Sequence, residues 1–123
     1  MTARRVILVV EDQVPVRRVI AEILDGFGYD ARLVGSAADA YMLTKAERPD
    51  AILLDMNLPD ANGTQTLDQL RLLRPDAPII MVTANADLVL AREALHRGAF
   101  DYVMKPFDMD RLDQVLEAAL QPR

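Results

Sequence analysis

The 123-residue sequence has no cysteine, which excludes a disulfide framework, a thiolate nucleophile and a cysteine metal cluster. No apolar run approaches the roughly 20 residues that a membrane-spanning helix needs. No basic leader followed by an apolar segment opens the chain, so we expect no export. We expect a single cytoplasmic domain over residues 1–123, because a chain of this size can bury a core without cross-links.

Lysine is also scarce, since only Lys45 and Lys105 occur among the 14 basic residues and the net charge is −5. An acidic domain without a basic cluster is a poor candidate for direct binding of nucleic acid. The charge alone indicates no more than a soluble domain. Histidine occurs once, and His96 lies late in a polar-faced helical pattern, so we expect it at the surface.

The sequence does contain a regular alternation of short apolar runs and helical patterns. VILVV (6–10), AILL (51–54) and IIMV (79–82) are typical of strands buried on both faces of a sheet, and weaker strands are expected at 31–34 and 102–104. Helical patterns lie at residues 16–24, 36–48, 64–73, 86–97 and 112–120. This order predicts a parallel sheet with helices on both faces.

Several residues are expected to mark helix ends. Ser36 with Asp39 resembles a capping box, and Asp108 is a good N-cap for the last helix. Gly26 is expected to stop the first helix, and Gly98 to close the fourth. Three scattered methionines are expected to fill the core: Met42, Met81 and Met104.

A doubly wound sheet of five strands commonly has the order 2-1-3-4-5, which makes its first and third strands neighbours. Glu11 and Asp12 follow the first expected strand, and Asp55 follows the third, at 51–54. One such aspartate is usually a turn former or a helix cap, but this order brings three carboxylates together. Their repulsion favours either protonation of one acid or a bound cation. Because the turns offer only oxygen ligands, Mg²⁺ or Mn²⁺ is favoured over Zn²⁺.

Two more strand ends place complementary groups beside Asp55. Thr83 follows the fourth expected strand, at 79–82, and Lys105 follows the last strand. Taken singly, this threonine is an ordinary turn residue and this lysine an ordinary surface charge. Together with the acids they supply a carboxylate nucleophile, a metal site, a cation for phosphoryl oxygens and a hydroxyl donor. Such a set is complete for phosphoryl transfer.

Four segments closely resemble the receiver domain of bacterial two-component response regulators. They are VVED (9–12), LLDMNLPDANG (53–63), VTA (82–84) and YVMKPF (102–107), and the resemblance covers essentially the whole chain. It implies a flavodoxin-like fold and a phosphorylation-dependent switch in a phosphorelay. It also implies Mg²⁺ as cofactor and, as partner, a sensor histidine kinase or a histidine phosphotransfer protein.

The resemblance implies a phosphoacceptor and a metal site. Asp55 is expected to take a phosphoryl group from a phosphohistidine and to ligate the metal. Asp12 is expected to bind Mg²⁺ directly, Glu11 through water, and Asn57 through its backbone carbonyl. Asn57 and Asn85 occupy positions that tune phosphoryl lifetime in the family, so that lifetime stays open. The catalysis is limited to phosphorylation and dephosphorylation of the domain itself, so we expect no conventional enzyme.

A second group of residues is expected to respond to phosphorylation of Asp55 and to alter the surface of the domain. By resemblance, Lys105 pairs with the phosphoryl group, Thr83 moves to hydrogen-bond it, and Tyr102 turns inward as the threonine moves. The resemblance also implies a cis peptide bond between Lys105 and Pro106, a form most accessible before proline.

The surface that changes is expected to comprise the helix over 86–97, the last strand and the last helix. Leu88, Val89 and Leu90 are consecutive, and a helix cannot bury all three on one face. At least one of them is therefore expected to meet solvent or a partner. A homodimer through this surface is compatible with the resemblance.

Two other functional classes use similar elements. A haloacid-dehalogenase-like phosphatase also has a nucleophilic aspartate after an apolar strand, but it needs a second aspartate where this chain has Asn57. A flavodoxin-like nucleotide or flavin binder needs a Gly/Ser/Thr-rich phosphate loop after the first strand, where EDQVP (11–15) is acidic. Steady hydrolysis of a phosphate ester would favour the phosphatase, and tight binding of flavin would favour the flavodoxin-like binder.

Overall fold

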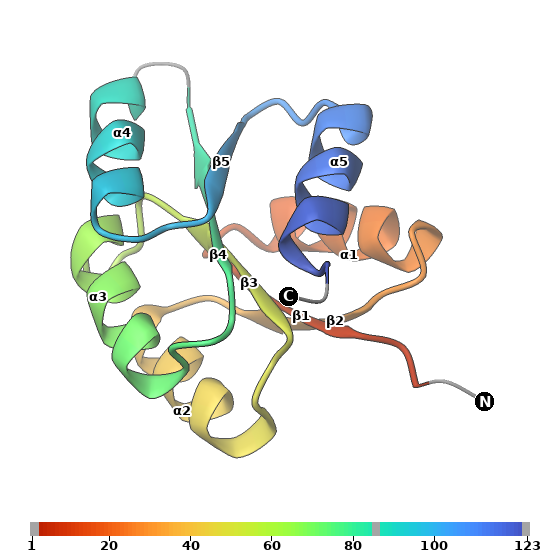
Figure 1. Cartoon of the computed structure of the whole chain (residues 1–123), viewed down its shortest axis with the longest axis horizontal. Coiled ribbons are helices and arrows are strands. Elements are labelled where there is room, and N and C mark those ends of the chain that lie inside the picture. The colour runs from red at the N-terminus through yellow and green to blue at the C-terminus, as the bar shows by residue number, and fades with distance from the viewer. Residues whose placement is uncertain (1–2, 85–86, 122–123) are drawn as a thin grey trace.

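Figure 1 shows a five-stranded sheet with helices on both of its faces. The computed structural model describes residues 3–84 and 87–121, so the expectation for Asn85 lies outside the described residues. All strand pairs are parallel and follow the order β2-β1-β3-β4-β5, which confirms the predicted doubly wound, flavodoxin-like arrangement. The strands are β1 (Val6–Val10), β2 (Asp30–Val34), β3 (Ala51–Asp55), β4 (Ile79–Thr83) and β5 (Asp101–Met104).

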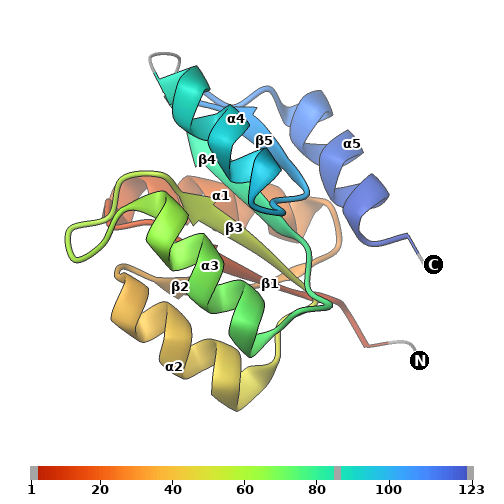
Figure 2. The ribbon, with the colours of Figure 1, turned by 60° about the vertical axis from the view of Figure 1, so that its left-hand side comes forward.

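Within the described residues, five helices alternate with the strands. They are α1 (Val14–Gly26), α2 (Ala37–Glu47), α3 (Gly63–Leu73), α4 (Leu88–His96) and α5 (Met109–Ala119). In Figures 1 and 2, α1 and α5 cover one face of the sheet, and α2, α3 and α4 cover the other. None of the described helices is both long enough and apolar enough to cross a bilayer.

Strand β1 shows why the apolar runs are continuous rather than alternating. Leu8 and Val10 pack into the core beneath α2, α3 and α4, whereas Ile7 and Val9 pack into the core beneath α1 and α5. Successive side chains of a strand point to opposite faces, so a strand covered on both faces is apolar at every position. Burial on both faces therefore holds β1 in place, and β1 is the strand that Glu11 and Asp12 follow.

The predicted helix caps are confirmed, and α1 ends at the predicted Gly26. Ser36 Oγ accepts the Asp39 N–H at 3.1 Å, and the Asp108 carboxylate accepts N–H groups at the start of α5. The residue after Gly26, Phe27, is the C-cap of α1, and its N–H donates to the carbonyls of Ile23 and Leu24. The chain then turns at Gly28, whose φ of +95° is a left-handed conformation that glycine adopts without a Cβ clash.

Two of the three methionines predicted to fill the core lie at the surface. Met81 in β4 is fully buried, but Met42 on α2 is 70% exposed and Met104 at the end of β5 is 41% exposed. The prediction is wrong for Met42 because α2 does not separate polar and apolar residues onto opposite faces, so its sequence gives no reliable inward side. His96 is exposed, as predicted.

Candidate functional site

The predicted carboxylates meet at the carboxyl ends of β1 and β3. These neighbouring strands pair Val10 with Leu54, so the residues that follow, Glu11 and Asp55, lie at the same edge of the sheet. One carboxylate oxygen from each of Glu11, Asp12 and Asp55 lies within 4.8 Å of the others. Glu11 and Asp55 are only 2% and 6% exposed, whereas Asp12 is exposed. The cluster therefore combines two buried acids with one that faces solvent.

Lys105 brings a positive charge to this cluster. Its Nζ donates to Glu11 Oε1 at 2.5 Å and lies 3.4 Å from Asp55 Oδ2. The backbone N–H of Lys105 donates to the Thr83 carbonyl at 2.8 Å, and the peptide bond to Pro106 is cis. The ends of β4 and β5 thus hold the ammonium against both buried acids.

Burial and the neighbouring charges shift the pKa values of Glu11 and Lys105. Burial raises the pKa of Glu11, and the Asp55 carboxyl raises it further against the opposing effect of Lys105. Burial lowers the pKa of Lys105, but the hydrogen bond to Glu11 and the charges of the two acids outweigh it, so the pKa is raised overall. The lysine therefore stays charged, and the two buried acids, Glu11 and Asp55, share this one cation.

Hydrogen bonds of Asn57 connect the loop after β3 to the start of α4. The Asn57 backbone N–H donates to Asp55 Oδ1 at 3.0 Å, and its Nδ2 donates to Asp87 Oδ2 at 3.2 Å. Asn57 also pairs with Asn62 in an isolated antiparallel bridge. The sequence indicated a role for Asn57 but none for Asp87, because 30 positions separate the two residues and no local pattern relates them.

A second loop contact was also absent from the sequence predictions. Asp60 accepts the N–H groups of Ala37 and Ala38 at 3.0 and 3.1 Å, so it satisfies the start of α2 from the loop between β3 and α3. These backbone N–H groups lower the pKa of Asp60. In the sequence, Asp60 lies in a Pro-Asp-Ala-Asn-Gly stretch that indicates only a turn.

Asp60→Ala is expected to destabilise the domain at neutral pH by removing this contact. The folded-state pKa is lowered, so the contribution of Asp60 is present above its unfolded pKa of about 3.9 and is lost as pH falls through the folded value. The difference in urea midpoint from the wild type should therefore shrink as pH decreases toward about 3. Asp60→Asn, which keeps one acceptor, should show less of this pH dependence. A difference that stays constant with pH would contradict the electrostatic account.

Thr83 ends β4 and Tyr102 lies on β5, the two strands that follow β3 in the order of the sheet. Thr83 is buried, and its hydroxyl donates to the Ala84 carbonyl at 3.1 Å. Tyr102 is half-buried and packs against the core beneath α2, α3 and α4. Among the side-chain hydrogen bonds of residues 3–84 and 87–121, neither reaches Asp55 or Lys105.

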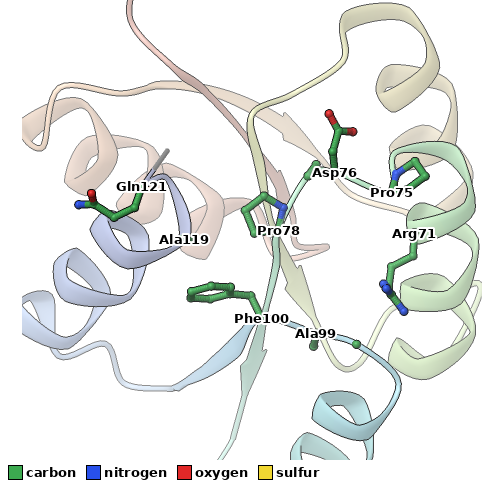
Figure 3. Close-up of a pocket in the computed structure, with 10 residues that line it drawn as sticks. Arg71, Pro75, Asp76, Pro78, Ala99, Phe100, Ala119 and Gln121 are labelled. Carbon is green, nitrogen blue, oxygen red and sulfur yellow. The ribbon is translucent and has the colours of Figure 1, made fainter. Parts of the chain in front are cut away.

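A pocket of about 600 Å³ lies at the other end of the sheet (Figure 3). Pro78 precedes β4 and Phe100 precedes β5, so both lie at the amino ends of strands, away from the acidic cluster. Figure 3 shows Arg71 on α3 at one side of this opening and Gln121, after α5, at the other. The pocket therefore contributes no residue to the acidic cluster.

Gly63, the first residue of α3, is expected not to tolerate a side chain. An added Cβ would lie 2.9 Å from Met56 Cα and 3.0 Å from the Met56 carbonyl oxygen, so the backbone next to Asn57 would have to move. We expect Gly63→Ala to lower the free energy of unfolding in urea by about 1–3 kcal/mol. Gly26→Ala is the matched control, because an added Cβ there meets nothing within 4 Å. Equal urea midpoints for the two variants would contradict this prediction.

The sequence of this chain is similar to those of known regulatory proteins. Residues 7–117 match the response regulator receiver domain family. The chain is 37% identical over 121 residues to the regulatory protein AtoC of Escherichia coli K12, covering 98% of this chain and 26% of AtoC. It is 39% identical over 122 residues to the DNA-binding response regulator MtrA of Mycolicibacterium smegmatis, covering 98% of this chain and 52% of MtrA. The chain thus spans about a quarter to a half of these relatives.

Two solved structures show the same fold at similar length. The receiver domain of NtrX from Brucella abortus is 34% identical with a TM-score of 0.90, over 95% of this chain and 99% of that one. A receiver domain protein (CheY-like) from Methanospirillum hungatei JF-1 is 30% identical with a TM-score of 0.89, over 96% and 94% of the two chains. The chain belongs to the response regulator receiver domain family, whose members are signalling modules of two-component systems rather than conventional enzymes.

Proposed function

We propose that this chain is a phosphorylation-dependent switch in which Asp55 accepts a phosphoryl group from a phosphohistidine on a kinase or phosphotransfer partner. The observation that carries the proposal is the surroundings of Asp55. This buried carboxylate ends β3, lies within 4.8 Å of the two acids that follow β1, and has Lys105 Nζ at 3.4 Å. We take residues 1–123 as one receiver domain, and a cytoplasmic location belongs to the same proposal.

The transfer is a substitution at phosphorus. An oxygen of the Asp55 carboxylate forms the new P–O bond while the P–N bond to the partner's histidine breaks. The imidazole nitrogen leaves with the bonding electron pair. Lys105 can pair with a phosphoryl oxygen, because its ammonium already contacts the acceptor carboxylate. Hydrolysis of the acyl phosphate then returns the carboxylate and inorganic phosphate.

The donor set of the cluster fits Mg²⁺. When bound, this ion supplies positive charge that offsets the repulsion between a phosphoryl group and the surrounding acids. Asp12, Asp55 and the Asn57 backbone carbonyl would hold it, since Mg²⁺ prefers oxygen ligands and keeps several waters. Glu11 already accepts a hydrogen bond from Lys105 at 2.5 Å, which supports an indirect role through water.

We propose that the conformational response to phosphorylation of Asp55 involves the side chains of Thr83 and Tyr102. The Thr83 hydroxyl, which now donates to the Ala84 carbonyl, would turn to donate to a phosphoryl oxygen. Tyr102 would then turn inward as the threonine moves. Support comes from position, since β4 ends in Thr83 next to Asp55 of β3 and Tyr102 pairs with Met81 in the neighbouring strand.

The surface formed by α4, β5 and α5 is proposed as the site of the changed interaction. Leu88, Val89 and Leu90 are 38%, 79% and 40% exposed, which confirms that the start of α4 meets solvent or a partner. Such side chains can pair with a second copy of the chain. Sedimentation velocity with and without beryllofluoride, a stand-in for the phosphoryl group, tests this homodimer. A monomer under both conditions would contradict it.

The names of the relatives bear on which molecules this receiver domain contacts. AtoC is named a regulatory protein and MtrA a DNA-binding response regulator, and this chain spans only part of each. For residues 1–123 we propose no direct contact with nucleic acid, because the net charge is −5 and no basic cluster occurs in the sequence. The partner that fits a receiver is a histidine kinase or a phosphotransfer protein.

Phosphorylation by acetyl phosphate, measured as intact mass, tests the proposal. With Mg²⁺ we expect one phosphoryl adduct per chain that hydroxylamine removes, as it does for acyl phosphates. Removing Mg²⁺ with EDTA should lower the adduct by at least about tenfold, because charge compensation is lost. Mg²⁺ should also raise the urea midpoint of the wild type, since a ligand that binds only the folded state stabilises it. No adduct and no stabilisation by Mg²⁺ would contradict the proposal.

A further inference from the structure

Asp87 occupies a helix-capping position, but its side chain bonds elsewhere. It is the N-cap residue of α4, and within the described residues its carboxylate accepts no N–H from the first turn. An aspartate at this position usually accepts such an N–H. The caps of three other helices do so: Ser36 for α2, Asn62 for α3 and Asp108 for α5. Asp87 Oδ2 instead accepts Asn57 Nδ2 at 3.2 Å.

Asn57 connects this bond to the proposed phosphoacceptor. Its backbone N–H donates to Asp55 Oδ1 at 3.0 Å, so a single asparagine bridges the acceptor carboxylate and the carboxylate at the start of α4. A phosphoryl group brings about −1.5 to −2 units of charge to the Asp55 side chain. Asn57 is the only residue between the two carboxylates in this chain of hydrogen bonds, so the added negative charge acts on the Asp87 carboxylate at close range.

Little apolar burial holds the start of α4 in place. Its first three residues are all exposed, and the buried residues of this helix are the small Ala91 and Ala94. A hydrogen bond between side chains at this end is therefore a substantial part of what fixes the first turn against the loop after β3.

We propose that Asp87 is a positioning residue that holds the start of α4 against Asn57 while Asp55 is unphosphorylated, and that phosphorylation releases this bond. The inference rests on the proposed phosphorylation of Asp55. Once released, the Asp87 carboxylate can accept N–H groups of its own helix, so the side chain has two alternative partners. This gives α4 two discrete arrangements that the charge at Asp55 selects.

Asp87→Ser tests the bond directly, because serine still caps a helix but is too short to reach Asn57. Without a ligand, amide hydrogen exchange over residues 88–91 should be about three- to tenfold faster in this variant than in the wild type, as for loss of one hydrogen bond. With Mg²⁺ and beryllofluoride, the two proteins should exchange at the same rate, since the bond is then absent from both. Beryllofluoride should accordingly bind Asp87→Ser about three- to tenfold more tightly.

Two further variants separate the bond from the charge. Asp87→Asn keeps an oxygen that accepts from Asn57, so its exchange without ligand should match the wild type. Glu93→Gln removes the same charge from the other half of α4, where Glu93 contacts Arg97, and should leave beryllofluoride affinity unchanged. If Asp87 has only a structural role, Asp87→Ser will exchange faster by the same factor with and without beryllofluoride. That result would overturn the inference.

The outcomes for the wild type separate the two proposals. If the wild type binds no beryllofluoride in the presence of Mg²⁺, the phosphoacceptor proposal fails and this inference fails with it. If the wild type binds beryllofluoride and Asp87→Ser matches it in affinity and in exchange, only the role of Asp87 is overturned. The double variant Asn57→Ala/Asp87→Ser should exchange over 88–91 without ligand as Asp87→Ser does, because the same bond is lost only once.

Discussion

Replacing Asp55 by asparagine is expected to abolish the phosphoryl adduct that acetyl phosphate and Mg²⁺ produce on the wild-type domain. Asparagine keeps the size of the side chain and an oxygen that can accept the Asn57 N–H, which lies at 3.0 Å in the wild type. It removes the carboxylate, and a neutral amide is not a useful nucleophile toward phosphorus. The adduct measured by intact mass should fall by at least about a thousandfold, to background.

This loss is not expected to come from unfolding. Asp55 is one of three acids that lie within 4.8 Å of one another, and the substitution removes part of their mutual repulsion. Without Mg²⁺, Asp55→Asn should therefore be at least as stable in urea as the wild type. Mg²⁺ should stabilise the variant less than the wild type, because one charged ligand is gone.

Asp60→Asn is the matched control for this experiment. It makes the same chemical change in the loop that follows β3, at an exposed carboxylate that accepts N–H groups of α2 rather than facing the cluster. Asp60→Asn should keep the full adduct. If Asp55→Asn kept it as well, with peptide fragmentation placing the phosphoryl group on Glu11 or Asp12, the assignment of Asp55 would be wrong.

The acidic cluster could be predicted from the sequence because three local signals were enough. Continuous apolar runs indicated strands buried on both faces, and acids followed two of these runs. The alternation of strands and helices then indicated a parallel sheet, in which the common strand order places the first and third strand ends side by side. The observed order and the cluster of Glu11, Asp12 and Asp55 follow from these signals without knowledge of any side-chain contact.

The loop contacts could not be predicted in the same way. Asp60 reaches the start of α2 across 23 positions, and Asn57 reaches Asp87 across 30. These segments have no hydrophobic period, and their partners depend on backbone positions that only the packed helices and sheet define. For the same reason no role could be predicted for Asp87, although it lies at the start of the helix that we expect to respond to phosphorylation.

The partner of Lys105 is a further point on which the sequence was incomplete. The sequence placed this lysine beside Asp55, but the structure gives its shorter contact to Glu11, at 2.5 Å against 3.4 Å to Asp55. Burial explains the preference, because Glu11 is only 2% exposed and an ionised carboxylate so far from water needs a cation or a proton. Lys105 therefore has a structural task in the absence of metal as well as its proposed task toward the phosphoryl group.

Lys105→Met is accordingly expected to have two separable effects. Without Mg²⁺, the variant should lose about 2 kcal/mol of unfolding free energy, because it leaves Glu11 buried without its cation. This loss is below the roughly 3–5 kcal/mol of a fully buried pair, since the lysine side chain is 28% exposed. Saturating Mg²⁺ should recover most of the stability by restoring positive charge to the cluster. The adduct should nevertheless stay at least about tenfold below that of the wild type, because the phosphoryl oxygens lose their ammonium partner.

Lys45→Met provides the control, since Lys45 is the only other lysine of the sequence and lies exposed on α2. It removes the same charge and should leave both the urea midpoint and the adduct close to those of the wild type. The recovery by Mg²⁺ is the decisive measurement, because a packing defect at residue 105 would persist at any Mg²⁺ concentration. If stability without metal were unchanged in Lys105→Met, the contact between Lys105 and Glu11 would contribute nothing to the fold. If Mg²⁺ recovered the adduct together with the stability, Lys105 would serve only to balance the charge of the acids.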